Sequence, residues 1–284
     1  MRRIQFIELH EQSWFPSSLR HGITDALQFG LNLSKVYTPI ASLVLSVLDR
    51  TPSRSIVDLC SGGGGPWLDI SQWFPQDLGD FHILLTDKHP NLQAFQYVKA
   101  ASKNHISYNS GSVDATKVPA ELQGFRTMFS SFHQFPPEEA RAILQNAVDA
   151  RQSIGIFEIT KRAPSTIALM FPWALMLFIL TPLIRPFRWS RLFYTYVLPI
   201  IPLVLLFDGV VSCLRTYRPA ELCEIIENVS GIGYQWNVGE HSKTAGRLQI
   251  TYLIGSPEPY MSARCLTRDT NGRPEEAAGL TGSR

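Results

Sequence analysis

Short apolar runs alternate with amphipathic segments between residues 51 and 162. The runs have the length and composition of buried strands, and the segments between them repeat apolar residues at helical spacing. Five strands are expected, in the stretches RSIVDLC (54–60), FHILLTD (81–87), ISYNSGSVDA (106–115), FRTMFSSF (125–132) and SIGIFEIT (153–160). Strands that alternate with helices predict an α/β fold with a mainly parallel sheet.

Residues 1–50 carry aromatic and aliphatic positions at helical spacing. This pattern predicts two or three amphipathic helices, which would form an N-terminal lid on the sheet. Ser13, Ser17 and Thr24 are candidate N-caps, because a hydroxyl at the first turn can accept a hydrogen bond from a backbone N–H group.

Residues 216–257 again show the alternation of helix and strand patterns that is seen in residues 51–162. Residues 216–257 predict an amphipathic helix and two strands joined by a short turn, and together with residues 51–162 they would complete one α/β domain with an antiparallel edge. Residues 258–284 are rich in Gly, Arg, Glu and Thr, so a disordered tail is expected there.

Residues 163–215 interrupt this domain as an apolar insert. The run from Ala163 to Ile184 has no charged residue and is long enough, if helical, to cross a hydrocarbon core of about 30 Å. A second uncharged run extends from Leu192 to Phe207. Between the two lies RPFRWSR (185–191). The runs are interrupted by prolines, each of which removes a helix hydrogen bond that lipid cannot replace.

Three arrangements of the insert are compatible with its sequence. We favour a re-entrant or interfacial hairpin in which Arg185, Arg188, Arg191 and Trp189 meet lipid headgroups. A two-pass hairpin would place these arginines in a translocated loop, against the positive-inside tendency. In the third arrangement the insert packs on the helix predicted within residues 13–31 and forms a hydrophobic substrate chamber or a dimer interface.

Composition narrows the class of protein. The 284 residues carry a formal net charge of +2 without a basic stripe, which argues against nucleic-acid binding. The four cysteines form no CxxC motif and the seven histidines form no HxxxH or HxH pair, so no metal site is expected. Reduced thiols and the absence of a visible signal peptide favour the cytoplasmic face of a membrane.

The sequence VDLCSGGGGP (57–66) places a glycine-rich turn directly after the first predicted strand. Glycines there let a ligand approach backbone amides that no Cβ shields. Asp87 ends the second strand, where a carboxylate can accept ribose hydroxyls, and Asp114 follows the third strand, where it can address an adenine edge. The spacing does not fit the dinucleotide fingerprint G-x-G-x-x-G, and no Lys-Ser/Thr pair follows the glycines as in a P-loop.

This pattern resembles class I S-adenosylmethionine (SAM)-dependent methyltransferases, whose first motif is D/E-x-G-x-G-x-G. The chain has Asp58, Cys60, Gly62 and Gly64 at the four fixed positions, so a cysteine replaces the first glycine. The resemblance covers roughly residues 55–160 and 216–256. It implies a Rossmann-like methyltransferase sheet with an antiparallel C-terminal hairpin, an N-terminal helical lid and the apolar insert after the fifth strand.

The resemblance also implies the cofactor contacts. Gly62 and Gly64 would line the methionine moiety, Asp87 would hold the ribose, and Val113 with Asp114 would contact adenine. Asp58 would orient the loop or the cofactor's amino group. The expected cofactor site further includes the neighbouring residues Cys60, Ser61, Lys88 and Ala115.

Candidate catalytic residues lie where strands end. His133 follows the fourth strand and Glu158 ends the fifth, so both should face the crevice at the carboxyl edge of the sheet. His133 is a candidate general base or substrate donor, with a structural histidine as the alternative. Asp208, beside an apolar run, either orients a substrate hydroxyl, bonds to Arg215 or caps a helix. Trp14 and Tyr37 are candidate covers of the site.

These features predict a membrane-associated methyltransferase that uses SAM and acts on a lipophilic small-molecule or lipid acceptor. Two alternatives remain: a methyltransferase-like membrane scaffold or lipid-binding protein that has lost activity, for which Cys60 is the main argument, and a soluble small-molecule enzyme with a hydrophobic lid. The acceptor, the methylated atom and the oligomeric state do not follow from the sequence.

Overall fold

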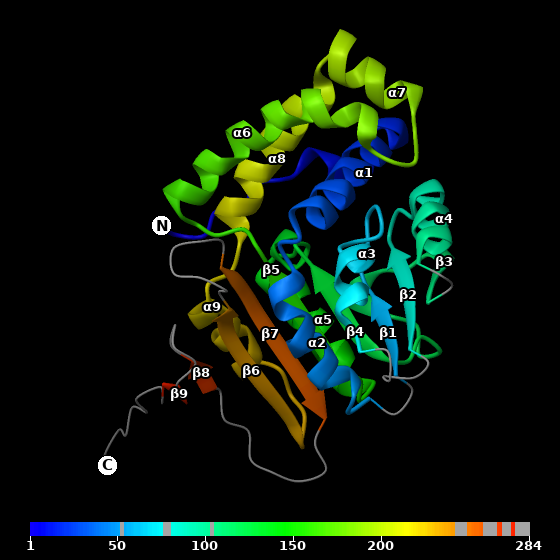
Figure 1. The fold of residues 1–284 in the computed structure, drawn as a ribbon. Coiled ribbons are helices and arrows are strands. Elements are labelled where there is room, and N and C mark those ends of the chain that lie inside the picture. Colours follow the sequence, from blue (N-terminus) through cyan, green and yellow to red (C-terminus); the bar gives the residue numbers. More distant parts are fainter. Residues whose placement is uncertain are drawn as a thin grey trace.

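The computed structural model describes residues 1–51, 54–75, 81–102, 105–241, 249–257, 266–268 and 274–275. Within them a mixed sheet is flanked by helices on both faces and capped at one end by further helices (Figure 1). The expected disordered tail, residues 258–284, lies outside the described residues except for two short strands.

The sheet has the predicted topology. Its strands follow the order β3-β2-β1-β4-β5-β7-β6-β8-β9, in which β1 to β5 are parallel and β7 runs antiparallel to β5 and β6. The strands are β1 (Ser55–Asp58), β2 (His82–Asp87), β3 (Ile106–Ser112), β4 (Phe125–Phe129), β5 (Ile154–Glu158), β6 (Tyr234–His241), β7 (Ile250–Pro257), β8 (Leu266–Arg268) and β9 (Pro274–Glu275). The expected Rossmann-like methyltransferase fold is therefore confirmed.

Alternation along the strands builds two cores. Ile56 and Val57, adjacent on β1, are both buried but belong to clusters on opposite faces of the sheet. One face is covered by η2 (Thr38–Ile40), α2 (Ala41–Leu48), α3 (Trp67–Ile70) and α4 (Leu92–Ala101), and η3 (Ser71–Trp73) follows α3. The other is covered by α5 (Pro137–Asp149) and α9 (Pro219–Glu227), and η5 (Ala115–Lys117) and η6 (Phe132–Gln134) lie in the loops after β3 and β4.

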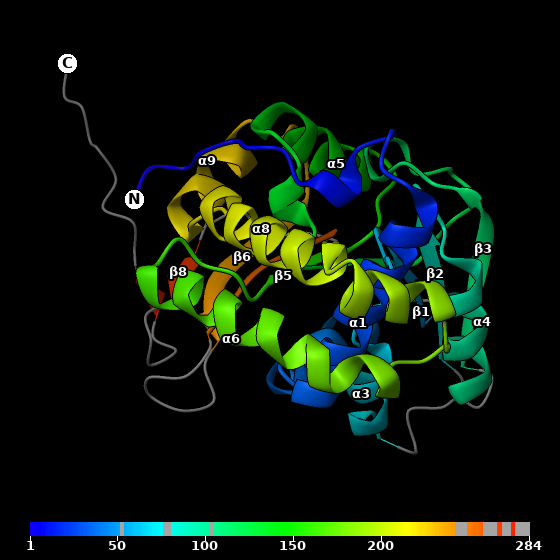
Figure 2. The ribbon, with the colours of Figure 1, turned by 90° about the horizontal axis from the view of Figure 1, so that it is seen from above.

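The apolar insert leaves the sheet after β5 and returns before α9. It forms α6 (Pro164–Leu180), η7 (Thr181–Leu183), α7 (Trp189–Leu192), the π-helical turn η8 (Phe193–Val197) and α8 (Ile200–Arg215). Together with α1 (Ser17–Ser34) these helices form the cap, which lies over the carboxyl ends of the parallel strands (Figures 1 and 2).

A third apolar core holds the cap together. Phe15, Leu19 and Ile23 pack there with Leu177 and Ile201 of the insert. The packing of the insert on the helix predicted within residues 13–31 is thus observed. By length and composition, one helix in the described residues, Pro164–Leu183, could cross a membrane, and two bent helix pairs would qualify if each were one span.

Two sequence expectations about the cap are wrong. Helix α1 begins at Ser17 with Pro16 as its N-cap and no side-chain cap, and Thr24 lies inside the helix. Arg188 and Arg191 do not face outward: their side chains are 13% and 1% exposed and both bind Asp25 of α1. A buried carboxylate needs a cation nearby, and these arginines supply it from the insert.

Candidate cofactor and catalytic site

The glycine-rich turn after β1 has the backbone geometry that its composition predicts. Gly62 and Gly64 have φ of 55° and 111°, a region that favours glycine. Cys60 also lies in the left-handed region, with φ of 55°, at the position where the related motif has its first glycine. A Cβ on Gly63 would come within 2.4 Å of the Thr24 carbonyl oxygen, so the turn packs closely beneath α1.

Asp58, at the end of β1, organises this turn. It accepts hydrogen bonds from the hydroxyls of Ser61, at 2.6 Å, and Thr127, at 2.7 Å. Burial raises the pKa of Asp58 to about 7, although both hydroxyls and the Trp67 side chain favour the charged form. Asp58 thus ties Ser61 of the turn to Thr127 of β4.

Asp87 reaches the turn from the end of β2. Its carboxylate accepts the backbone N–H of Gly62 and the backbone N–H of His89, both at 2.7 Å. Val113 donates its backbone N–H to the Asp87 carbonyl at 2.9 Å. The residues expected at the methionine, ribose and adenine ends therefore lie along one edge, where a ligand binds in open α/β sheets.

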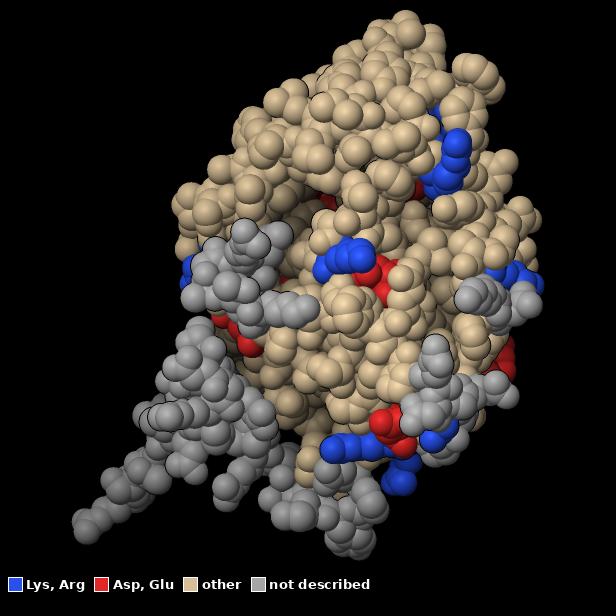
Figure 3. Space-filling model, in the orientation of Figure 1, with Lys and Arg blue, Asp and Glu red and all other residues tan. Residues whose placement is uncertain are grey.

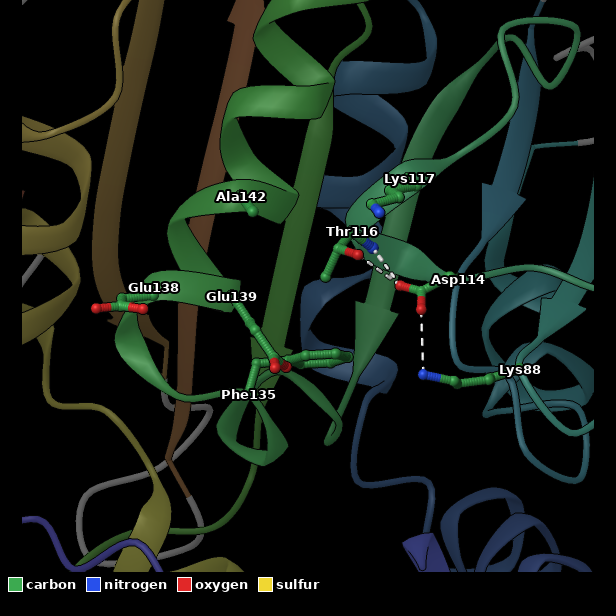
Figure 4. Close-up of a pocket in the computed structure, with 8 residues that line it drawn as sticks. All are labelled: Lys88, Asp114, Thr116, Lys117, Phe135, Glu138, Glu139 and Ala142. Atoms are coloured by element: carbon green, nitrogen blue, oxygen red, sulfur yellow. Dashed lines mark hydrogen bonds and ion pairs between the residues drawn. The ribbon is translucent and has the colours of Figure 1, made fainter. Parts of the chain in front are cut away.

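The expected adenine end borders a pocket of about 290 Å³. Lys88 and Asp114 line one side and form an ion pair at 3.1 Å, while Phe135, Glu138 and Glu139 line the other (Figure 4). Asp114 also caps η5 by accepting the N–H and the hydroxyl of Thr116, which lowers its pKa despite partial burial. Val113 and Ala115 beside it are buried.

His133 and Glu158, each a candidate from a different strand end, lie in direct contact. His133 Nδ1 lies 2.8 Å from Glu158 Oε2, and Glu8 Oε1 lies 3.3 Å from its other ring nitrogen. Burial favours the neutral ring, but the two carboxylates outweigh it and raise the pKa of His133 to about 10. A histidine that stays protonated at neutral pH cannot accept a proton. His133 is therefore better suited to position its neighbours than to act as a general base.

Asp208 binds the N-terminus of the chain instead of Arg215. Its carboxylate accepts the backbone N–H groups of Leu9 and His10 and lies 2.7 Å from His10 Nδ1. Burial opposes charge on the His10 ring, but Asp208 and Glu8 raise its pKa. Of the alternatives considered for Asp208, the Arg215 bond is not observed among the described residues. The carboxylate instead caps the 3-10 helix η1 (Leu9–Glu11), whose first two N–H groups it accepts.

Residues 1–16, here named the N-terminal strap, were expected to belong to a helical lid, but among them only η1 (Leu9–Glu11) is helical, and the sequence did not indicate their contacts. The strap runs alongside α8 and past α5, above the carboxyl edge of the sheet (Figure 2). Arg3 donates to the carbonyls of His133 and Phe135, and Arg20 donates to the carbonyls of His10 and Gln12. The signal in the sequence is ELHE (8–11), in which three of the four residues are ionisable and Leu9 alone is apolar.

Arg215 of α8 lies against two carboxylates of the strap. Its Nη1 is 3.5 Å from Glu8 Oε1 and 3.3 Å from Glu11 Oε2. Burial raises the pKa of Glu8, but His133, His10 and Arg215 outweigh it, and the net result is a pKa of about 2. The donor atoms of Glu8, His10 and Glu11 lie within 4.8 Å of one another. Because Arg215 already supplies positive charge there, we assign no metal ion to this group.

The two aromatic residues expected to cover the site lie in different environments. Tyr37 is fully buried, and its hydroxyl bonds to Ser130 Oγ at 2.6 Å and to the Phe157 carbonyl at 3.0 Å, so it is a core residue and not a cover. Trp14 is 64% exposed, and its ring packs edge-on against Phe15.

No protein-family model and no curated protein matches this chain. Similar solved structures include the mitomycin 7-O-methyltransferase MmcR, with 15% identity and a TM-score of 0.45 over 78% of this chain and 54% of that one. A SAM-dependent methyltransferase from Aquifex aeolicus has 13% identity and a TM-score of 0.44 over 81% and 97%. PigF with SAH (S-adenosylhomocysteine) has 16% identity and a TM-score of 0.47 over 85% and 62%. The chain thus spans little more than half of MmcR.

Proposed function

We propose that this chain is a SAM-dependent methyltransferase. The observation that carries the proposal is the junction of the glycine turn with Asp87, where a carboxylate from the end of β2 meets left-handed backbone that carries no Cβ at Gly62 and Gly64. SAM would supply an activated methyl group, whose transfer depends mainly on the alignment of the acceptor. Asp87 would hold the ribose, Asp58 would keep the turn in shape, and the pocket beside Asp114 would border the adenine.

Titration calorimetry with SAM in mild detergent tests this proposal. Wild-type protein is expected to bind saturably, and Asp87→Ala to bind about 10- to 100-fold more weakly, because it loses hydrogen bonds from a charged group. Asp49→Ala, an exposed aspartate after α2, is the matched control and should bind like the wild type. Equal affinities for wild type and Asp87→Ala would contradict the ribose assignment.

We further propose that the acceptor is lipophilic or membrane-resident and that the cap docks on a lipid surface. On α6 the side chains of Phe171, Leu175 and Ile179, each four residues apart, are 55%, 67% and 75% exposed. In Figure 3 the upper, cap-bearing part of the molecule is largely free of charged side chains, apart from one cluster of Lys or Arg atoms at its right edge. An apolar stripe of this kind on a helix is typical of a surface that enters lipid.

The tip of the cap supports a lipid partner in particular. Arg185 is exposed and lies 5.9 Å from the Phe187 ring, and Trp189 is 78% exposed. A cation and aromatic rings beside an apolar helix suit the phosphate and headgroup layer of a membrane. With Arg188 and Arg191 committed to Asp25, Arg185 is the arginine of this loop that can meet phosphate. The cytoplasmic face of a membrane is the corresponding proposed location.

Flotation with vesicles of phosphatidylglycerol and phosphatidylcholine tests the docking surface. Leu175→Glu combined with Ile179→Glu should reduce binding by roughly 100-fold, since each apolar side chain contributes about 1.5 kcal/mol or more when buried. Ile232→Glu is the control, because Ile232 is fully exposed on the loop between α9 and β6. Unchanged flotation of the double variant would reject this face.

Arg185→Glu adds a separate test of the headgroup contact. Its binding should weaken on vesicles that contain phosphatidylglycerol and change little on phosphatidylcholine alone, because only the former carry net negative charge. A wild type that stays in solution with both vesicle types would favour a soluble enzyme, with the cap as its hydrophobic lid. Wild-type protein that floats but binds no SAM would favour the membrane scaffold.

A further inference from the structure

The strap and the carboxyl edge of the sheet share a buried network of charges. It links four carboxylates to three cationic groups through contacts of 3.9 Å or less; the carboxylates are Glu8, Glu11, Glu158 and Asp208, and the cations are His10, His133 and Arg215. With both histidines protonated, four negative and three positive charges leave one negative charge without a counter-charge.

Within the network, we assign the unbalanced negative charge to the Glu11 carboxylate. One of its oxygens, Oε2, lies 3.3 Å from Arg215, whereas the other, Oε1, is buried without a hydrogen-bond partner in the described part of the chain. Burial first, and then the neighbouring Glu8 carboxylate, raise the pKa of Glu11 to about 7. The other carboxylates of the network have a histidine partner within 3.3 Å.

Two more observations bear on a polar ligand at this edge of the sheet. Ser131 Oγ, just after β4, is buried and lacks a hydrogen-bond partner among the described residues. Glu11 belongs to the strap, which runs above the carboxyl edge of the sheet where the expected cofactor site lies (Figure 2). Its charge also contributes at the glycine turn: burial chiefly, and then Asp87, Asp58 and Glu11, raise the pKa of the Cys60 thiol.

We propose that the Glu11 carboxylate is the counter-charge for the sulfonium of SAM, so that the strap distinguishes the cofactor from its product. This inference rests on the proposed function. Methyl transfer moves the methyl carbon to the acceptor and leaves the electron pair of the broken C–S bond on sulfur, so SAH is uncharged at that atom. Glu11 then loses its counter-charge, and the product is held less tightly than the cofactor.

The pH dependence follows from the groups that face Glu11. Glu8 and His10 of the strap, Arg215 of α8 and His133 of η6 surround it. A sulfonium favours the ionised form, so SAM binding near pH 7 should release a proton from Glu11, and SAM affinity should rise as pH increases through 7. SAH has no charge at sulfur and should show neither effect. Because Asp58 titrates in the same range, the readout is the difference between wild type and a Glu11 variant.

Calorimetry with SAM and SAH at pH 6 and pH 8, each in two buffers of different ionisation enthalpy, tests the proposal. Wild type should prefer SAM over SAH by about tenfold at pH 8 and by less at pH 6, while Glu11→Gln should bind both ligands equally at both pH values. Glu11→Asp should restore part of the preference. Glu224→Gln, an exposed glutamate on α9, is the control.

The outcomes separate this inference from the proposed function. Continued SAH binding by Glu11→Gln would show that its site is folded, so a loss of SAM preference there would support the counter-charge. A wild-type ratio of SAM to SAH affinity in Glu11→Gln would overturn the inference and leave the methyltransferase proposal standing. Binding of neither ligand by folded wild type would overturn both.

Discussion

Asp25 of α1 and Arg191 of α7 form an ion pair in which Oδ2 lies 2.7 Å from Nη1, with side chains 0% and 1% exposed. The other terminal nitrogen of Arg191 donates to the carbonyls of Ile184 and Pro186. The Asp25 carboxylate also accepts a hydrogen bond from Arg188, which donates a second one to Asn91. One acidic residue thus holds the loop at the tip of the cap against α1.

Asp25→Ala should therefore destabilise the protein strongly. It would leave a buried guanidinium without a counter-charge, which typically costs about 3–5 kcal/mol. The measurement is the free energy of unfolding from urea titration, with Asp49→Ala as the exposed control. A loss below about 1 kcal/mol would mean that water reaches Arg191 or that other groups compensate its charge.

The Glu8–His133–Glu158 contact predicts how stability depends on pH. The pKa of His133 rises from 6.5 to about 10 on folding, so its contribution is complete below pH 6.5 and is lost as pH rises towards 10. The pKa of Glu8 falls from 4.5 to about 2, so its contribution is present above pH 4.5 and is lost below it. Free energies of unfolding measured from pH 4 to 10 should decline on the alkaline side.

The variant His133→Gln identifies the source of that decline. It removes the titrating ring, so the fall in stability between pH 6.5 and 10 should become shallower, although the variant is less stable at neutral pH. Glu158→Gln should have a smaller effect of the same sign, because Glu8 still faces the ring. An alkaline slope identical to that of the wild type would place the titrating group elsewhere.

Cys60→Gly should stabilise the protein. A non-glycine residue in the left-handed region costs roughly 1 kcal/mol, and Cys60 has a φ of 55°. We expect a gain of about 1 kcal/mol, reduced by the loss of partly buried side-chain contacts, with SAM binding retained. Cys223→Gly, inside α9, is the contrasting control and should lose stability, by about 0.3 kcal/mol from helix propensity alone. A destabilised Cys60→Gly would show that the thiol's packing outweighs the backbone strain.

The strands and the turn after β1 could be predicted because they depend on nearby residues. Successive side chains of β1 alternate between the two apolar cores on opposite faces of the sheet, and the conformation of Gly62 and Gly64 reflects the absence of a Cβ. The acids Asp87 and Asp114 then follow from where parallel strands end. Because these features are local, the sequence indicated the position of the expected cofactor site. The contacts that complete the site come from distant residues, and the sequence did not indicate them.

The sequence by itself determined the fold class, the glycine turn and the apolar character of the insert, since each is written in local periodicity and composition. Only the tertiary structure decided which charges face inward. Arg191 meets Asp25 across 166 positions, and Asp208 meets His10 across 198. In the sequence, a charged side chain is equally compatible with solvent, lipid headgroups or a buried partner. Folding brings the partner within about 3 Å, and no local pattern predicts which residue that partner is.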